Sequence, residues 1–199
     1  MRKKELKLLK EFNMEVIKFT PEYECLSNAF NSGELAFNEY ISKTALKDKI
    51  NGSGVTYIVV DKKNHKKLLV AYYTISTSTV HIKDLYDYED DAIPEEEKRE
   101  HFSPISAFMI NMFAVDKKYQ DCLYNNQLVS SLILRQIISN LYDMSVNLIA
   151  AKTILLCAVP DAVKFYENNR FLKLADEFTL FDKCDAMDNI PMYLPIHNF

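Results

Sequence analysis

Two almost wholly apolar segments constrain the fold most. They are PISAFMINMFAV at residues 104–115 and TILLCAV at 153–159. A strand with so few polar positions is buried on both faces, which requires helices on both sides of its sheet. Between the two segments, apolar residues recur at helical spacing over four turns: Leu128, Leu132, Ile133, Ile137, Leu141 and Tyr142. The order strand, helix, strand predicts an α/β chain with a covered sheet.

The other segments add strands and helices to this centre. Residues 14–19, 55–61 and 66–80 are rich in β-branched and aromatic side chains, and the charged loop at 62–67 predicts that the last two pair antiparallel. Helices are expected at 21–30, at 33–50 and after Pro160, with closing strands at 170–174 and 192–196. We therefore expect an α/β (α+β) fold with a mixed, mostly antiparallel sheet of about six to seven strands.

Length and charge limit the organisation of the chain. The 199 residues, 48% of them apolar, suit a single domain over residues 1–199. Residues 84–103 carry nine acidic side chains against Lys98 and Arg99, which predicts a solvated acidic insertion. The net charge of −4 disfavours a general electrostatic grip on nucleic acid.

Several classes of protein are not indicated. The N-terminal residues lack the apolar run of a secretory signal, and no segment approaches the roughly 18 apolar residues of a membrane span, so we expect a cytoplasmic protein without membrane contact. The four cysteines have neither close pairing nor metal-type spacing, so free thiols are expected. The four histidines are scattered, and no metal site is predicted.

Glycine is scarce, with three residues in total and none after Gly54. Later tight turns must therefore use Asn, Asp or Pro, and Asn169 is expected to take the left-handed position that ends the helix after Pro160. A codon preference of the source genome explains the same shortage without any functional reason.

Two motifs together resemble those of the GNAT N-acetyltransferase superfamily. They are MINMFAVDKKYQ at residues 109–120, which leads into the long helix, and AVPDAVKFYENNRF at 158–171. Residues 30–41, residues 102–120 and the closing MYLPI are similar to the toxin-type GNATs of toxin–antitoxin pairs. The likeness extends over about residues 15–196.

The resemblance implies acetyl-CoA as cosubstrate and assigns residues to it. Tyr166 would protonate the departing thiolate, a suitable pairing since phenol and thiol pKa values lie near each other. The backbone of one strand would hold the pantetheine arm, and the following loop would hold the pyrophosphate. The cofactor-binding residues implied are Met112, Phe113, Ala114, Val115, Gln120, Asp121, Cys122, Leu123, Tyr124, Asn125, Asn126 and Phe165.

Leu123 and Asn125 stand where the family has glycines in this loop, and Arg170 replaces a third. Leu123 either blocks the approach of phosphate to the backbone or points outward and costs little. The alternative interpretation of the loop is a plain strand–helix connection capped by Asp121 and Asn125. The leading function is acetyl transfer to a primary amine; the alternative is a catalytically impaired GNAT-fold binding protein with weak or no CoA binding.

The resemblance also suggests partners. The amine acceptor is a small molecule, a protein or aminoacyl-tRNA, and the acidic charge disfavours tRNA. An antitoxin protein is implied by the toxin branch, and a homodimer is left open.

Overall fold

The computed structural model describes residues 6–63, 66–84, 101–175, 178–180 and 188–196, and most of the predicted acidic insertion lies outside these ranges. The chain divides into two compact units, which are described separately. Unit 1 contains residues 1–76 and 110–143, and unit 2 contains residues 77–109 and 144–199. Strands β4 (Lys66–Asp84) and β5 (His101–Val115) and helix α5 (Val129–Asn147) each contribute residues to both units.

Unit 1 is built on an antiparallel sheet. Strand β2 (Met14–Lys18) pairs with β3 (Val55–Lys63), which pairs with β4 through the predicted hairpin, and β5 follows in the strand order. The register places Tyr57 opposite Tyr73, with their rings stacked 5.2 Å apart. The predicted strands and their antiparallel pairing are confirmed.

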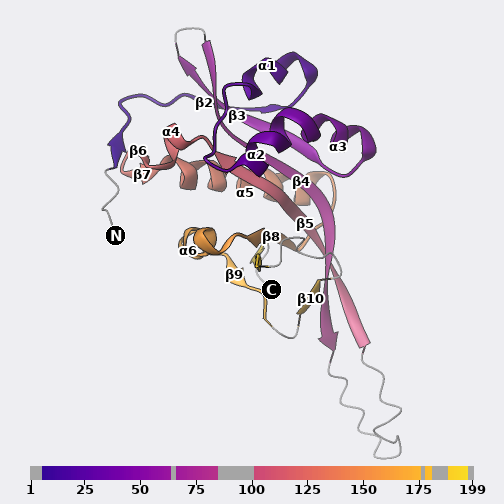
Figure 1. The fold of residues 1–199 in the computed structure, drawn as a ribbon. Coiled ribbons are helices and arrows are strands. Elements are labelled where there is room, and N and C mark those ends of the chain that lie inside the picture. The colour runs from indigo at the N-terminus through magenta and orange to yellow at the C-terminus, as the bar shows by residue number, and fades with distance from the viewer. Residues whose placement is uncertain (1–5, 64–65, 85–100, 176–177, 181–187, 197–199) are drawn as a thin grey trace, which may run out of the picture. The chain divides into compact units, whose positions relative to one another are not determined.

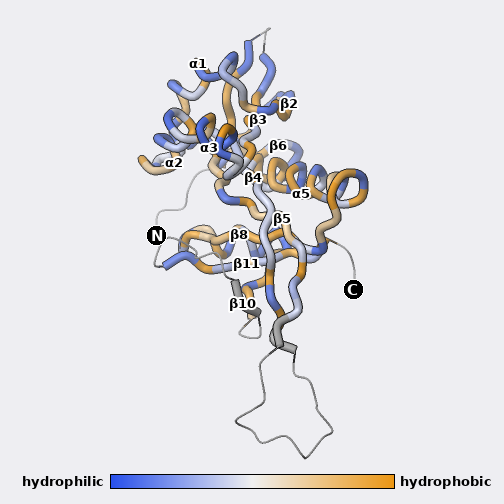
Figure 2. The backbone as a smooth tube through the Cα atoms, turned by 90° about the vertical axis from the view of Figure 1, so that its right-hand side faces the viewer, coloured by the Kyte–Doolittle hydropathy of each residue, from blue (hydrophilic) through white to orange (hydrophobic). Residues whose placement is uncertain are grey.

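Helices cover both faces of this sheet, as the apolar strands require (Figures 1 and 2). One face carries η1 (Pro21–Tyr23), α1 (Glu24–Ser27), α2 (Leu35–Glu39), η2 (Tyr40–Thr44) and α3 (Ala45–Asn51), and the other carries α5. The core on the first face includes Phe19, Phe30, Tyr40, Ile41, Ala45, Ile58, Val60, Leu69, Tyr72 and Ala114. On the other face, α5 buries Val129, Ile133, Leu134, Ile137 and Leu141 almost completely.

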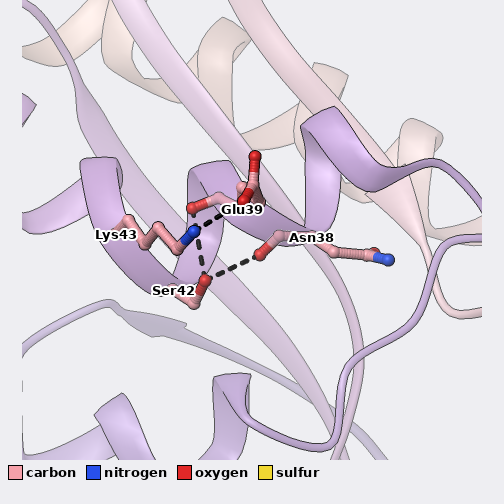
Figure 3. Close-up of polar contacts among 4 residues, drawn as sticks. All are labelled: Asn38, Glu39, Ser42 and Lys43. Carbon is pink, nitrogen blue, oxygen red and sulfur yellow. Dashed lines mark hydrogen bonds and ion pairs between the residues drawn. The ribbon is translucent and has the colours of Figure 1, made fainter.

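The helix predicted over residues 33–50 is interrupted by a π-helical segment at Tyr40–Thr44. Within this segment, the Ser42 hydroxyl donates to the carbonyl oxygens of Asn38 and Glu39, and Lys43 pairs with Glu39 (Figure 3). A serine that bonds back to the preceding turn competes with the regular ladder and bends a helix. Gly52 ends the helix with a φ of 75°, a conformation that glycine adopts without strain.

Unit 2 contains the second apolar strand. Strand β8 (Thr153–Ala158) pairs antiparallel with β11 (Ile190–Pro195), which pairs with β9 (Leu172–Lys173), and β10 (Phe178–Leu180) pairs with β4. Lys152 donates its backbone N–H to the carbonyl of Ser106 on β5 at 2.9 Å. A 3-10 turn, η4 (Pro160–Ala162), opens helix α6 (Val163–Asn168), as Pro160 predicted.

The cysteines differ in part from expectation. Cys25 is an exposed free thiol and Cys122 a buried one, in agreement with the prediction. Cys157 on β8 is disulfide-bonded, so the expectation of four free thiols was wrong for this residue. Sequence spacing gave no sign of the bond, because distant cysteines meet only once the sheet has formed.

A buried carboxylate joins the helical layer of unit 1 to the end of β5. Asp116 is 2% exposed; its Oδ2 accepts the backbone N–H of Asn31 at 3.0 Å and its Oδ1 that of Lys118 at 2.9 Å. The second bond caps the short helix α4 (Lys117–Gln120). Asp116 also donates its own N–H to the carbonyl of Val70 at 2.7 Å. These contacts fix the point where the chain leaves β5.

Replacing Asp116 by alanine removes the acceptor of two part-buried hydrogen bonds, those from the backbone N–H groups of Asn31 and Lys118. We expect Asp116→Ala to lower the free energy of unfolding by about 2–4 kcal/mol. Urea denaturation followed by circular dichroism measures this change. The exposed neighbour serves as a control: Lys117→Ala should change stability by less than about 0.5 kcal/mol, and equal effects of the two substitutions would contradict this role of Asp116.

Candidate functional site

The candidate cofactor strand is the last part of β5. Ala114 and Val115 are buried, whereas Met112 and Phe113 are half-buried, and Met112 packs against the core beneath the helical layer. All four lie in unit 1. Backbone groups of a strand can bind an extended ligand whatever the side chains are, so this part of the predicted site does not depend on glycine.

The side chain of Gln120 links the end of α4 to two other segments of the chain. Its Nε2 donates to the carbonyl oxygens of Ser32 at 2.7 Å and Val115 at 2.9 Å. Both side-chain hydrogens are therefore used by the protein. Ser32 is in turn held by Asn38, whose Oδ1 accepts the Ser32 N–H at 2.8 Å.

A small β-hairpin replaces the expected loop after Gln120. Cys122–Tyr124 form β6 and Gln127–Leu128 form β7, with Asp121 as the C-cap residue of α4. Between the strands, Asn125 and Asn126 have φ values of 49° and 61°. Two successive left-handed residues are typical of a type I′ hairpin turn, and Asn tolerates them well. Asn125 thus serves a turn between strands, and the long helix begins four residues later, at Val129.

The N-terminal segment pairs with this hairpin. Strand β1 (Lys7–Leu8) runs parallel to β6, and the N–H groups of Lys7 and Leu9 donate to the carbonyls of Asp121 and Leu123 at 2.9 and 2.8 Å (Figure 1). Leu123 is therefore part of a three-stranded sheet with the order β1-β6-β7. Two-residue strands carry too little periodicity to be found in a sequence, which is why this sheet was not predicted.

A hollow of about 590 Å³ is lined by residues of the hairpin, of α5 and of the segment 12–14. Its lining includes Tyr124 and Asn125 from the predicted loop, together with Arg135 of α5, whose Nη1 donates to Oε1 of Gln127 at 3.1 Å. Arg135 brings a cation next to the hairpin, and the sequence analysis did not single it out. Its place on α5, seven positions after Leu128, was the only signal in the sequence.

Tyr166 lies in unit 2 on helix α6. It is 8% exposed, and its ring makes edge-to-face contacts with Phe165 and Phe171 at centroid distances of 5.2 and 5.6 Å. Burial raises the pKa of Tyr166 well above its usual value. Among the described residues, its hydroxyl has no hydrogen-bond partner. The aromatic contacts fix the ring, and the polar tip has no structural bond to satisfy.

The end of α6 corrects the predicted cap. Asn169 has a φ of −103°, whereas Arg170 has a φ of 73° and takes the left-handed position. Arg170 donates its N–H to Glu167, and Phe171 donates to Tyr166 at 3.1 Å, which together form a Schellman motif. Asn169 instead caps through its side chain, since its Nδ2 donates to the carbonyl of Phe165 at 2.8 Å.

The described residues contain no group of three or more His, Cys, Asp or Glu side chains arranged to hold a metal ion. No helix in the described part of the chain is long and apolar enough to cross a membrane.

The fold is similar to that of solved bacterial toxins. A tyrosine-to-phenylalanine mutant of the AtaT toxin has a TM-score of 0.67 at 16% identity, over 92% of this chain and 89% of that one. The AtaTR complex bound with acetyl-CoA gives 0.67 at 15% identity, over 92% and 94%. A tyrosine-to-phenylalanine mutant of KacT gives 0.66 at 14% identity, over 92% and 95%.

Further similar structures show AtaT with acetyl-methionyl-tRNAfMet and the KacTA complex with DNA. No protein-family model matches the chain, and no curated protein matches it in sequence. At these identities the likeness establishes the fold, and the predicted α/β GNAT fold class with a mostly antiparallel sheet is confirmed.

The left-handed Arg170 provides a test of the α6 cap. A non-glycine residue pays about 1 kcal/mol for this conformation, and the Arg170 side chain is exposed. We expect Arg170→Gly to raise the free energy of unfolding by about 1 kcal/mol in urea denaturation. Asn169→Gly is the matched control and should destabilise, because it removes the bond to Phe165; stabilisation by both substitutions would contradict the assignment.

Proposed function

We propose that this chain is an N-acetyltransferase that moves an acetyl group from acetyl-CoA to a primary amine. The observation that carries the proposal is Tyr166, a buried tyrosine held by aromatic neighbours whose hydroxyl has no partner among the described residues. The ring is fixed on a helix whose sequence resembles the GNAT motif, and its hydroxyl can hydrogen-bond a ligand atom.

The reaction needs one proton for the leaving group. The amine lone pair attacks the thioester carbonyl carbon, the C–N bond forms and the C–S bond breaks. The thiolate takes the hydroxyl proton of Tyr166, and the proton lost by the new amide nitrogen passes to solvent, from which the tyrosine is reprotonated. Because burial raises the pKa of Tyr166, the hydroxyl is a weak acid. It therefore first hydrogen-bonds the sulfur as negative charge develops there, before the proton is transferred.

The two parts of acetyl-CoA are assigned to successive segments of the chain, first β5 and then the start of α5. The backbone of Met112 to Val115 binds the pantetheine arm, and the pyrophosphate lies downstream. Helix α5 starts at Val129, and the N–H groups of its first turn, such as those of Val129 and Ser130, have no acceptor within the helix. The positive end of this 19-residue helix favours phosphate. Because the hairpin takes the place of the predicted Gln120–Asn126 loop, we assign the hydrogen-bond donors for phosphate to the start of α5.

The similar structures support the cosubstrate. An AtaTR complex was solved with acetyl-CoA, and tyrosine-to-phenylalanine mutants were made of both AtaT and KacT. AtaT was also solved with the C-terminus of the antitoxin AtaR, which supports an antitoxin as a partner of this chain.

Charge is distributed unevenly, and this bears on the acceptor. Unit 1 has sixteen Lys and Arg against twelve Asp and Glu, whereas unit 2 has eight against sixteen. The acidity that disfavoured tRNA therefore belongs to unit 2, and unit 1 has a net charge of +4. A basic unit suits the phosphate backbone of RNA. We include aminoacyl-tRNA among the acceptors on this ground, as AtaT was solved with acetyl-methionyl-tRNAfMet.

The pairing of β1 with β6 favours one alternative. The carbonyl groups of Asp121 and Leu123 are bonded to Lys7 and Leu9, so part of the segment predicted to bind pyrophosphate belongs to the three-stranded sheet β1-β6-β7. A GNAT-fold protein that has lost cofactor binding would tolerate this arrangement, because its function would not require these residues to bind phosphate. The two functions differ in whether acetyl-CoA binds at all.

Substitution of Tyr166, the proposed acid, distinguishes a role in the reaction from a role in binding acetyl-CoA. We expect Tyr166→Phe to lower kcat by about a hundredfold or more, because the thiolate then leaves without a proton donor. The rise in Tm caused by acetyl-CoA should stay within one degree of that of the parent chain, since the ring is retained. Release of free thiol, followed by a disulfide reagent, measures the rate.

Phe171→Leu is the control for aromatic packing, because it removes a ring that packs 5.6 Å from that of Tyr166 and leaves the hydroxyl in place. It should lower stability more than kcat. Unchanged turnover in Tyr166→Phe would remove Tyr166 from its proposed role.

The raised pKa of Tyr166 sets the pH dependence. The group is protonated, and so able to act as the acid, at every pH below its pKa, which lies above the ordinary tyrosine value of about 10. We expect kcat to show no tyrosine-dependent decline up to pH 10. A loss of kcat between pH 8 and 9.5 that disappears in Tyr166→Phe would contradict this assignment.

A further inference from the structure

An exposed asparagine lies on strand β5 in unit 1. Asn111 directly precedes Met112, and its neighbour Ile110 is only 3% exposed. Asparagine is disfavoured within strands. A polar side chain that costs stability at such a position needs another reason.

The carboxamide of Asn111 is held in one orientation. The Ser76 hydroxyl on β4 donates to Oδ1 of Asn111 at 3.0 Å. This bond occupies the acceptor end and leaves the two Nδ2 hydrogens as donors. Among the described residues, no other partner of Asn111 is found. Within the described part of the chain, the donor end is therefore open to an atom of a ligand.

Gly54 keeps the space beside this donor open. Its backbone does not adopt a positive φ, so no turn geometry requires glycine there. A Cβ at this position would lie 2.8 Å from Cγ2 of Thr74 and 3.5 Å from Nδ2 of Asn111. The first distance is shorter than real Cβ contacts allow. In a chain with three glycines, this one is required by the close approach of Thr74, and its backbone lies beside Nδ2 of Asn111.

We propose that Asn111 orients the acceptor by donating a hydrogen bond from Nδ2 to an oxygen next to the reacting amine, with Ser76 as the positioning residue. This inference rests on the proposed function. With the phosphates at the α5 end, the pantetheine arm runs back from Val115 towards Met112, and its acetyl group lies at the Met112 end. Asn111 is the next residue along the strand, where the acceptor must meet the acetyl carbon.

A hydrogen-bond donor at this position favours amine substrates that carry a hydrogen-bond acceptor. Nδ2 can bond only to a hydrogen-bond acceptor, and an amine with a carbonyl on its α-carbon provides one. α-Aminoacyl esters, α-aminoacyl amides and peptide N-termini have this carbonyl. Polyamines and lysine side chains lack it, so the inference favours the first class of substrate over the second.

Two small probe amines test this selection. Glycinamide has a carbonyl oxygen next to its amine, and ethylamine does not. We expect Asn111→Ala to lower kcat/KM for glycinamide by about three- to tenfold, the value of one neutral hydrogen bond, and to change it less than twofold for ethylamine. Rates are compared at equal concentrations of free base. Ser76→Ala should cause a smaller loss in the same direction, with acetyl-CoA affinity unchanged in both variants.

Asn28→Ala, at an exposed asparagine on α1, is the matched control and should leave both amines unaffected. Equal losses for the two amines in Asn111→Ala, or no loss for either, would overturn the proposal.

A second measurement does not depend on turnover or on the variant folding. In the unsubstituted chain, the side-chain amide NMR signal of Asn111 should shift when glycinamide is added in the presence of CoA and stay in place with ethylamine. If the signal does not shift on addition of glycinamide although CoA binds, the proposed role of Asn111 is overturned. A chain that binds no CoA in the same titration overturns the proposed function instead.

Discussion

The buried carboxylate of Asp116 is the contact on which the rest of the candidate site depends. It bonds to the backbone of Asn31 from the helical layer and to Lys118 in the first turn of α4. Gln120 adds two bonds from its side chain to carbonyl groups on both sides of the same junction. Together these bonds fix where β5 ends, and therefore where Met112 to Val115 lie relative to the chain that leads into α5. A charged group buried in this way is stable only while its partners remain in place.

The site proposed for the cofactor uses backbone more than side chains. Strand β5 and the first turn of α5 offer N–H groups whose positions do not depend on residue type, which allows the chain to dispense with loop glycines. The β6–β7 hairpin occupies the residues in between. Asn125 and Asn126 supply the left-handed angles that glycine would otherwise provide, and Arg170 does the same after α6. Scarce glycine thus changes the local route of the chain, while the fold is kept.

Long periodic or apolar segments could be predicted from the sequence, because burial over many residues leaves a strong pattern. The β3–β4 hairpin, β5, β8 and α5 all belong to this class. The pairing of β1 with β6, the β6–β7 hairpin and the disulfide at Cys157 depend on contacts between distant or very short segments, which leave no periodicity. Tyr166 was found from a motif, whereas Asn111 stands out only when the Ser76 bond and its exposure on strand β5 are seen.

Calorimetric titration of the chain with acetyl-CoA tests the central claim most directly. The account predicts one site per chain with a dissociation constant at or below the millimolar range, because β5 and the start of α5 supply the backbone donors that phosphate and pantetheine need. Absence of binding heat up to millimolar acetyl-CoA, at two temperatures so that a zero enthalpy is not mistaken for no binding, would contradict it. The chain would then be a GNAT-fold protein without the cofactor.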